Sequence, residues 1–319
     1  MSPERKPSPD AGRGPFRNVV VYGAGAVGSY LGARLAPLVP VTLVARRAHV
    51  EAINARGLSV GGEVELLAPY GSVRAVTRLD AIESATLVLV TVKLGDLQAA
   101  GAELAGLART DTVFLLAQNG LHGRELFFRG AEKALTVVRA IASCGVDLTR
   151  PGEVEFWGGG LSFEGSPNGA EVMALFAEAG VASIESPDFE KALWKKLAVN
   201  CVANPLTALL GRRNREVIVP ELAGLRTRIV GEVAALAAAE GHPLPEDLPE
   251  RVDQALASSR NRSSMLQDLK RGRRTEVDHL NGFVDARSRE LGMAAPANAA
   301  LTALISALAA QPQRHKDTK

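Results

Sequence analysis

The chain has 319 residues, of which 46% are apolar and 23% are charged, and its formal net charge is +2. This length and apolar content allow a large core, favour two domains and exclude a fibrous or disordered protein. The charge is small and the basic residues are spread along the sequence, which argues against a nucleic-acid partner. The two cysteines cannot form a disulfide framework and indicate a reducing compartment.

The first residues, 1–16, carry four prolines and scattered charges but no apolar run. They resemble neither a signal peptide nor a membrane anchor, so we expect a disordered leader. No later apolar stretch reaches the roughly 18 to 20 residues that are needed to span a bilayer. We therefore expect a soluble, cytoplasmic protein without a membrane partner.

An apolar run at residues 19–22 stops at the sequence GAGAVG and gives way to helix-compatible residues. Strand, tight turn and helix in this order are typical of a dinucleotide-binding βαβ unit rather than of a glycine-rich turn without a ligand. The first glycine permits the turn, the second lets the backbone approach a pyrophosphate, and the third lets the helix pack against its strand. The helix N-terminus then faces the phosphates. The predicted cofactor-binding residues here are Gly23, Ala24, Gly25, Ala26, Val27 and Gly28.

The next expected strand, residues 39–44, is followed by Arg46 and Arg47. An NAD-specific fold usually places an acidic residue there for the ribose 2′-hydroxyl. A guanidinium suits a 2′-phosphate instead, because its planar donors pair with phosphate oxygens. We therefore expect NADP(H) as the cofactor, with Arg46 as its contact because Arg46 is nearer the strand. The alternative is that both arginines are solvated surface charge.

Strand-like and helical segments alternate through the rest of the first half, which indicates an α/β fold with a largely parallel sheet. A hairpin is expected around Gly61 and Gly62. Buried strands are expected at residues 87–92, 112–117 and 136–138. Two shorter runs, residues 153–156 and 161–163, are expected to form an antiparallel edge of the same sheet, with a glycine turn between them.

Beyond residue 187 the β signals vanish, and segments such as 216–240 and 276–291 show helical periodicity. The sequence thus predicts an N-terminal Rossmann-type domain at residues 17–187, an all-helical C-terminal domain at 188–310 and a polar tail at 311–319. Open sheets bind ligands at the carboxyl ends of their strands, so we expect the substrate between the two domains. Catalytic residues should come from both.

A mostly apolar helical segment, residues 194–207, places Lys196, Asn200 and Asn204 at i, i+4 and i+8, on one face. Burying such a line is costly unless something polar lies opposite, and a polar substrate would do that. Hydride delivery to a ketone leaves negative charge on oxygen, and Lys196 can supply the proton. The alternative is a structural network in which the amides bond neighbouring backbone and Lys196 extends to water.

Two further segments follow, residues 263–268 and residues 275–282. Thr275 and Glu276 near a helix start are ordinarily a capping arrangement, and the helix dipole stabilises a glutamate there whether or not it takes part in catalysis. The basic run at residues 270–274 is expected to be a solvated helix end or loop without a functional role.

At these residues the chain resembles the ketopantoate reductase (2-dehydropantoate 2-reductase) family. The resemblance extends over residues 18–308 and is carried by seven motifs in order. They are GAGAVG from Gly23, VTLVAR to Arg46, TVK to Lys93, QNG around Asn119, KLAVNCVANPLTA from Lys196, SSMLQD from Ser263 and TEVDHLNG from Thr275. It implies NADPH-dependent reduction of ketopantoate to (R)-pantoate, a step toward pantothenate and coenzyme A.

The resemblance also implies roles for single residues. Lys196 would donate the proton, and Glu276 would complete the catalytic site beside cofactor and substrate. The implied substrate contacts are Asn200 and Asn204 at the hydroxyl end, Ser264 at the carboxylate, Asn214 as a supplement, and Asn119. Lys93 and Asn119 would lie near the nicotinamide ribose, and Arg46 would meet the adenosine 2′-phosphate.

The chain departs from the family pattern at residues 140–146, where many members carry a TTHGA-like segment and this chain has Cys144 near the usual histidine. This change could reshape the pocket, so a reductase of a different 2-keto acid is one alternative. A non-catalytic protein that senses NADP(H) is another, and it would have no need of Lys196, Asn200, Asn204 and Glu276 together. The five histidines show no metal-binding spacing, so no metal is expected. A monomer and a homodimer both stay open, because the alanine-rich helix at residues 223–239 suits either.

Overall fold

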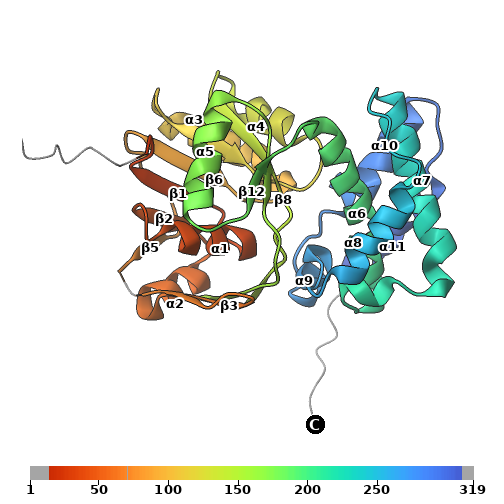
Figure 1. The fold of residues 1–319 in the computed structure, drawn as a ribbon, viewed down its shortest axis with the longest axis horizontal. Helices are drawn as coiled ribbons and strands as arrows, with labels where there is room; N and C mark the ends of the chain where they lie inside the picture. Colours follow the sequence, from red (N-terminus) through yellow and green to blue (C-terminus); the bar gives the residue numbers. More distant parts are fainter. Residues whose placement is uncertain (1–13, 70, 311–319) are drawn as a thin grey trace, which may run out of the picture.

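The computed structural model describes residues 14–69 and 71–310. The predicted leader, apart from residues 14–16, and the predicted tail lie outside these ranges. The chain forms an α/β unit followed by a helical unit, which lie side by side in Figure 1. The prediction of a Rossmann-type domain followed by an all-helical domain is confirmed.

A sheet of eight strands forms the centre of the α/β unit. Its strands are β1 (Asn18–Tyr22), β2 (Val41–Val44), β5 (Val73–Val76), β6 (Thr86–Val90), β7 (Val113–Leu116), β8 (Thr136–Ala142), β11 (Leu161–Phe163) and β12 (Ser183–Glu185). They lie in the order β12-β11-β8-β7-β6-β1-β2-β5. All neighbours from β8 to β5 are parallel, whereas β11 is antiparallel to β8.

Both faces of this sheet are covered, which explains why its strands read as unbroken apolar runs. Successive side chains point to opposite faces. Val19 and Val21 join the core on the face of α1 (Ala26–Leu35) and α5 (Pro167–Glu178). Val20 joins the core on the face of α3 (Leu97–Leu107) and α4 (Gly123–Ala131). The sheet is therefore the middle layer of the unit.

A second, smaller sheet packs on α1. It contains β3 (Leu58–Gly62), β4 (Leu66–Ala68), β9 (Val146–Arg150) and β10 (Glu153–Phe156), in the order β4-β3-β10-β9. The expected hairpin around Gly61 and Gly62 is confirmed, since β3 and β4 are antiparallel. The Phe156 ring stacks on Tyr30 of α1, with centroids 4.3 Å apart. These contacts fix α1 between the two sheets.

The expectation that residues 153–156 belong to an edge of the main sheet is wrong, whereas that for residues 161–163 is confirmed. β10 pairs with β3 and β9 in the small sheet, and β11 pairs with β8 in the main one. Gly158 and Gly159 have φ angles of 94° and 98°, a conformation that favours glycine. They turn the chain out of one sheet and into the other, instead of closing a hairpin.

The helical unit is built around α6 (Phe189–Leu210), whose residues Leu197, Ala198, Cys201 and Val202 are fully buried. Its other helices are η2 (Asn214–Val217), η3 (Pro220–Leu222), α7 (Ala223–Ala239), α8 (Leu248–Ser258), α9 (Ser264–Lys270), η4 (Val277–His279), α10 (Asn281–Glu290) and α11 (Pro296–Ala310). α7, α8, α9 and α11 pack against α6. Within the described residues, no helix is long and apolar enough to cross a membrane.

Pro205 lies inside α6, where it cannot donate the backbone hydrogen bond to Cys201 O. That carbonyl accepts instead from Asn281 Nδ2 of α10, at 2.9 Å. The same Nδ2 also donates to Asn298 Oδ1 of α11, at 2.9 Å. Asn281 and Asn298 are fully buried, so these bonds are shielded from water. The freed carbonyl thus connects α6 to the helices that pack on it.

Candidate active site

The turn between β1 and α1 has the geometry that a dinucleotide phosphate requires. Gly23 has a φ of 89°, and a Cβ there would lie 2.5 Å from Val92 Cγ1. A Cβ on Gly28 would lie 2.8 Å from Val21 Cγ1, so a larger residue would push α1 away from β1. At Gly25 the nearest atom to an added Cβ is Gly23 O, at 3.9 Å. That side of the turn is open to a ligand.

The N-terminus of α1 is also suited to an anion. Gly25, its N-cap residue, offers no side-chain cap, and the first turn contains no acidic residue. The first bond of the helix runs from Ser29 N to Gly25 O, at 3.0 Å. The amides of the first three helical residues, 26–28, therefore remain for another acceptor. Together with the open side of Gly25, they fit a pyrophosphate group.

Arg46 is the N-cap residue of α2 (Arg47–Arg56), at the carboxyl end of β2. Its side chain is exposed and has no ion-pair or hydrogen-bond partner in the described part of the chain. Arg273, from the helical unit, lies close enough for the two charges to interact. Lys270, Arg271 and Arg274 are exposed, as expected of a solvated helix end, but Arg273 is only partly exposed.

Lys196, Asn200 and Asn204 all lie on α6, and both asparagines are buried. Among residues 14–69 and 71–310, neither Lys196 Nζ nor the side-chain amide of Asn204 has a hydrogen-bond partner. Asn200 bonds a side chain of the α/β unit and no neighbouring backbone. Among the described residues the two asparagine side chains thus make no bond to neighbouring backbone, as the alternative of a structural network would require. The face of α6 instead carries polar groups that are available to a ligand.

The surroundings of Lys196 favour a labile proton. Burial lowers the pKa of Lys196, and Cys144, which acts in the opposite direction, would do so only as a thiolate. Cys144 lies between β8 and β9 of the α/β unit, and burial raises its pKa to about 11. The thiol is thus neutral near pH 7 and leaves the ammonium without a formal counter-charge. A lysine of this kind gives up its proton more readily than one in water.

Asn119 and Asn200 join the two units. Asn200 Nδ2 of α6 donates to Asn119 Oδ1, at 3.2 Å. Asn119 follows β7 in the QNG motif, at the carboxyl end of the parallel strands. Ligands of such sheets bind beyond these ends. The pair therefore places one predicted substrate contact from each unit in the same region.

Glu276 reaches from the helical unit to the α/β unit. It is the N-cap residue of η4, but its side chain does not cap that helix. Glu276 Oε1 accepts from the backbone N–H of Leu94, at 3.0 Å, in the first turn of η1 (Leu94–Asp96). Burial raises the pKa of Glu276, while the Leu94 amide and Lys93 act in the opposite direction. The capping interaction is thus made to a helix of the other domain.

Lys93 makes a second connection at the same place. Its Nζ lies 2.6 Å from Asp268 Oδ2 and donates to Arg274 O at 2.8 Å. Asp268 is buried in α9, and burial raises its pKa while Lys93 opposes this. Asp268 ends the SSMLQD motif but carried no predicted role. The sequence also did not single out Arg273, because a run of basic residues does not indicate which of its side chains is partly buried.

Family models match most of the chain. Residues 19–166 match the model described as ketopantoate reductase PanE/ApbA, and residues 188–309 match ketopantoate reductase PanE/ApbA C terminal. The chain belongs to the ketopantoate reductase family. This confirms the resemblance found in the sequence and makes the protein a pyridine-nucleotide-dependent oxidoreductase of a small keto acid.

Curated relatives agree with this assignment. The 2-dehydropantoate 2-reductase of Pyrococcus horikoshii is 32% identical over 298 residues, which cover 91% of this chain and 96% of that protein. The 2-dehydropantoate 2-reductase of Halobacterium salinarum is 33% identical over 302 residues, covering 90% and 97%. Both alignments include the α/β unit and the helical unit.

Solved structures agree on the fold. A PanE/ApbA family ketopantoate reductase from Ralstonia eutropha JMP134 has a TM-score of 0.83 and 34% identity, and the match covers 92% of this chain and 98% of that one. D-mandelate dehydrogenase in complex with NADH and anilino(oxo)acetate has a TM-score of 0.81 at 23% identity, with the same coverage. The second match shows a shared fold.

Two more residues predicted for the ketopantoate reductase site lie as follows. Ser264, at the start of α9, is exposed. Its neighbour Ser263 is buried and caps α9 by accepting from Leu266 N, at 3.1 Å. Asn214 is buried at the start of η2, where its Nδ2 donates to Ser259 Oγ at 3.0 Å. The Asn214 Oδ1 atom is buried without a partner in the described residues.

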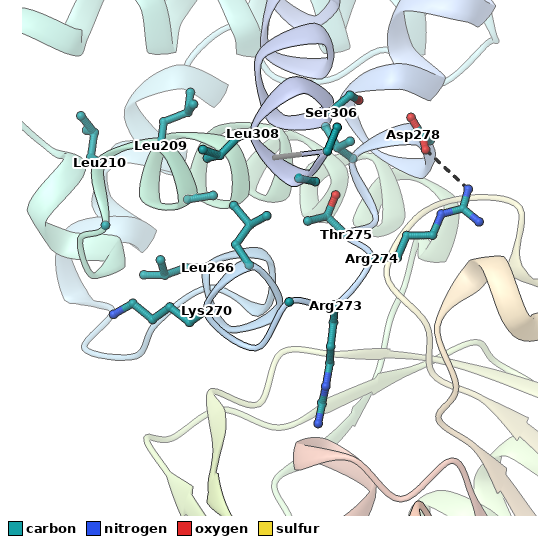
Figure 2. A pocket seen from close by; sticks show the side chains of 17 residues that line it. Leu209, Leu210, Leu266, Lys270, Arg273, Arg274, Thr275, Asp278, Ser306 and Leu308 are labelled. Atoms are coloured by element: carbon teal, nitrogen blue, oxygen red, sulfur yellow. Dashed lines mark ion pairs between the residues drawn. The ribbon is translucent and has the colours of Figure 1, made fainter. Parts of the chain in front are cut away.

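A groove of about 1090 Å³ lies elsewhere on this ketopantoate reductase family member (Figure 2). It is bounded by the ends of α6, α9 and α11 and by the loop before η4, and no predicted site residue lines it. Leu209, Leu210 and Leu308 are among its lining residues. The groove is therefore separate from the candidate active site, which lies between the two units.

Proposed function

We propose that the protein reduces ketopantoate to (R)-pantoate with NADPH, in the biosynthesis of pantothenate and coenzyme A. The observation that carries the proposal is the polar face of α6. Lys196 and Asn204 have no hydrogen-bond partner among the described residues, while Asn200 bonds Asn119 of the other unit. Polar groups in a largely apolar helix are stable when a polar ligand completes their bonds.

NADPH bound at the β1–α1 turn would supply the hydride for the keto carbon of the substrate. Lys196 would hold the proton that the keto oxygen takes as it becomes a hydroxyl. The low pKa expected from burial suits this role, because a weakly held proton is transferred more readily. The ammonium would also stabilise the negative charge that develops on the oxygen.

The remaining predicted residues would bind and orient. Asn200 and Asn204 would meet the hydroxyl end of ketopantoate, Ser264 its carboxylate, and Asn214 would supplement them. Asn119 and Lys93 would lie near the nicotinamide ribose. Glu276 would fix the position of η1 beside the cofactor, through its bond to the Leu94 amide at 3.0 Å. We place the enzyme in the cytoplasm, where its two free cysteines would stay reduced.

NADP(H) is proposed over NAD(H) because β2 ends at Arg46 and not at an acidic residue. The exposed guanidinium, without a partner in residues 14–69 and 71–310, is free to pair with a 2′-phosphate. A carboxylate at this position would favour the free ribose hydroxyl of NAD(H) instead.

A different 2-keto acid is the second candidate substrate. Cys144 lies beside Lys196, near the position where many family members have a histidine, so the pocket around the keto group has a different wall. Such a change would alter which side chain of a 2-keto acid fits, and would leave the hydride and proton transfers intact.

The test is the oxidation of NADPH by the purified protein, followed by absorbance, with ketopantoate beside a panel of other 2-keto acids. NADH with each substrate is the control. Turnover confined to ketopantoate and NADPH supports the proposal. Preference for another acid would identify that acid as the substrate. Tight NADPH binding without any turnover would support the non-catalytic sensor.

A further inference from the structure

Two arginines from different units lie within electrostatic range of each other. Arg46 lies at the carboxyl end of β2, and Arg273 lies in the loop between α9 and η4. Their charges interact, although their residue numbers differ by 227 (273 − 46). In the part of the chain that the structure describes, neither guanidinium has a carboxylate or hydrogen-bond partner.

The loop that carries Arg273 is fixed against the α/β unit. Lys93 bonds Asp268 on one side of Arg273 and the carbonyl of Arg274 on the other, at 2.6 and 2.8 Å. The Arg273 amide donates to Asp268 O, at 2.9 Å. Arg271 donates to the Leu148 carbonyl of β9. The position of Arg273 over the α/β unit is therefore set by several bonds around it.

Figure 2 shows how the side chains of this loop diverge. Arg274 turns toward Asp278, which lies 3.7 Å away within the helical unit. Arg273 points in a different direction, away from the groove and toward the α/β unit. The charge of Arg273 also acts on His49 of α2, whose pKa is lowered first by burial and then by Arg273. Arg273 thus extends toward the α/β unit, and its charge acts on Arg46, the N-cap residue of α2, and on His49 in the first turn of that helix.

This arrangement is unfavourable without an anion. Burial, then Arg46, then Arg271 lower the pKa of Arg273, and Asp268 is the only acid that opposes them among the described residues. Asp268 is already paired with Lys93. Two like charges that are held together in this way repel each other. A phosphate between them would turn that repulsion into two charge-assisted contacts.

We propose that Arg273 binds the 2′-phosphate of NADP(H) together with Arg46, so that the helical domain takes part in cofactor selection. This inference rests on the proposed NADPH dependence. The 2′-phosphate is the phosphate concerned because the end of β2 is where this fold meets the adenosine ribose. The pyrophosphate belongs to the N-terminus of α1, which has its own free amides.

The experiment compares two probes that differ only in the 2′-phosphate: adenosine 2′,5′-bisphosphate and 5′-AMP. Their dissociation constants are measured calorimetrically at one ionic strength for the full-length protein and for R46A, R273A and R273K. R47A and R274A are matched controls, because each removes an exposed arginine next to a proposed contact. Thermal unfolding of every variant checks that it is folded.

We expect R46A and R273A each to weaken the bisphosphate about tenfold or more, with 5′-AMP affinity changed less than about twofold. R273K should fall between wild type and R273A, since it keeps the charge and loses the planar fork. The two controls should bind both probes like wild type. If R273A does not fold, R273K alone must show the selective loss.

Two results would overturn the inference. One is R273A with undiminished preference for the bisphosphate while R46A has lost it. The other is an equal loss of both probes, which would mean that Arg273 acts on the shared part of the ligand or on the domain contact. Wild-type protein that binds the two probes equally would contradict the NADPH proposal itself, so the two failures are distinguishable.

Discussion

The carboxylate of Glu276 in the helical domain accepts a hydrogen bond from the backbone amide of Leu94 in the α/β domain, at 3.0 Å. Glu276 is buried, and the bond takes up an amide in the first turn of η1. The predicted catalytic glutamate is thus also a structural link between the domains. This dual position makes the effect of its replacement predictable.

Replacing Glu276 by alanine should lower the free energy of unfolding by about 1–3 kcal/mol, because the Leu94 amide loses its acceptor. E276Q keeps an oxygen that can accept the bond and should lose less. Urea unfolding of both variants measures this difference. Equal destabilisation by the two would show that the bond to Leu94 contributes little.

Lys196→Ala should keep NADPH binding and lower turnover by about a hundredfold or more, as expected for a lost general acid. Lys195→Ala is the matched control, since Lys195 is exposed on the same helix. The donor must be protonated, so the rate of ketone reduction should fall as the pH rises through the lowered pKa of Lys196. Steady-state kinetics over pH measure both effects, and an unchanged turnover in K196A would end this role for Lys196.

Asn119 and Asn200 should be energetically coupled, because their side chains share a bond of 3.2 Å between the domains. A double-mutant cycle with alanine at each position should give a coupling of about 0.5–1.5 kcal/mol in the free energy of unfolding. The same cycle on the KM for ketopantoate would reveal whether the pair acts jointly on substrate. Strict additivity in both measurements would mean that the two amides act independently.

His49 should make stability depend on pH below neutrality. Burial, and then Arg273, lower its pKa from 6.5 to about 4. Its Nδ1 accepts from Gly152 N at 2.9 Å, so the neutral ring is the form that fits. As the pH falls, His49 takes up its proton in the unfolded chain before it does so in the folded protein. The contribution of the neutral His49 to stability is therefore complete above pH 6.5 and is lost as the pH falls toward 4. The loss should approach about 3 kcal/mol.

Unfolding by urea at several pH values between 7 and 4 measures this dependence. The variant His49→Gln should unfold with a weaker dependence over the same range, because it has no group that titrates there. An identical pH dependence in the wild type and the variant would assign the effect to other residues.

The sequence predicted the main sheet well because its strands are buried on both faces and stand out as apolar runs. Strand β10 was assigned to the wrong sheet because its partner β3 is distant in the sequence. An apolar run predicts a strand but does not indicate which strand it pairs with. Pairing between distant strands depends on packing, here on α1, which separates the two sheets.

The site followed the same division. Lys196, Asn200 and Asn204 could be grouped in advance, since helical spacing alone puts them on one face. The bond of Glu276 to Leu94 could not, because a glutamate at a helix start looks like a local cap. Arg273 was indistinguishable from its basic neighbours in the sequence, because the position of its loop depends on bonds to Lys93 and Leu148, which are distant in the chain.

The proline inside α6 has a consequence for the alignment of the catalytic groups. Because Pro205 has no N–H to donate, Asn281 Nδ2 takes the place of the missing helix donor at Cys201 O, and a shift of the helix bearing Lys196 along its axis would break that bond. Asn281 comes five positions after Glu276 in the chain, by their residue numbers. The bond at Pro205 therefore helps to hold Lys196, the proposed proton donor, in register along the axis of α6 with Glu276, which contacts η1. An alanine at position 205 would add an N–H that competes with Asn281 for Cys201 O and would weaken this connection between the two segments.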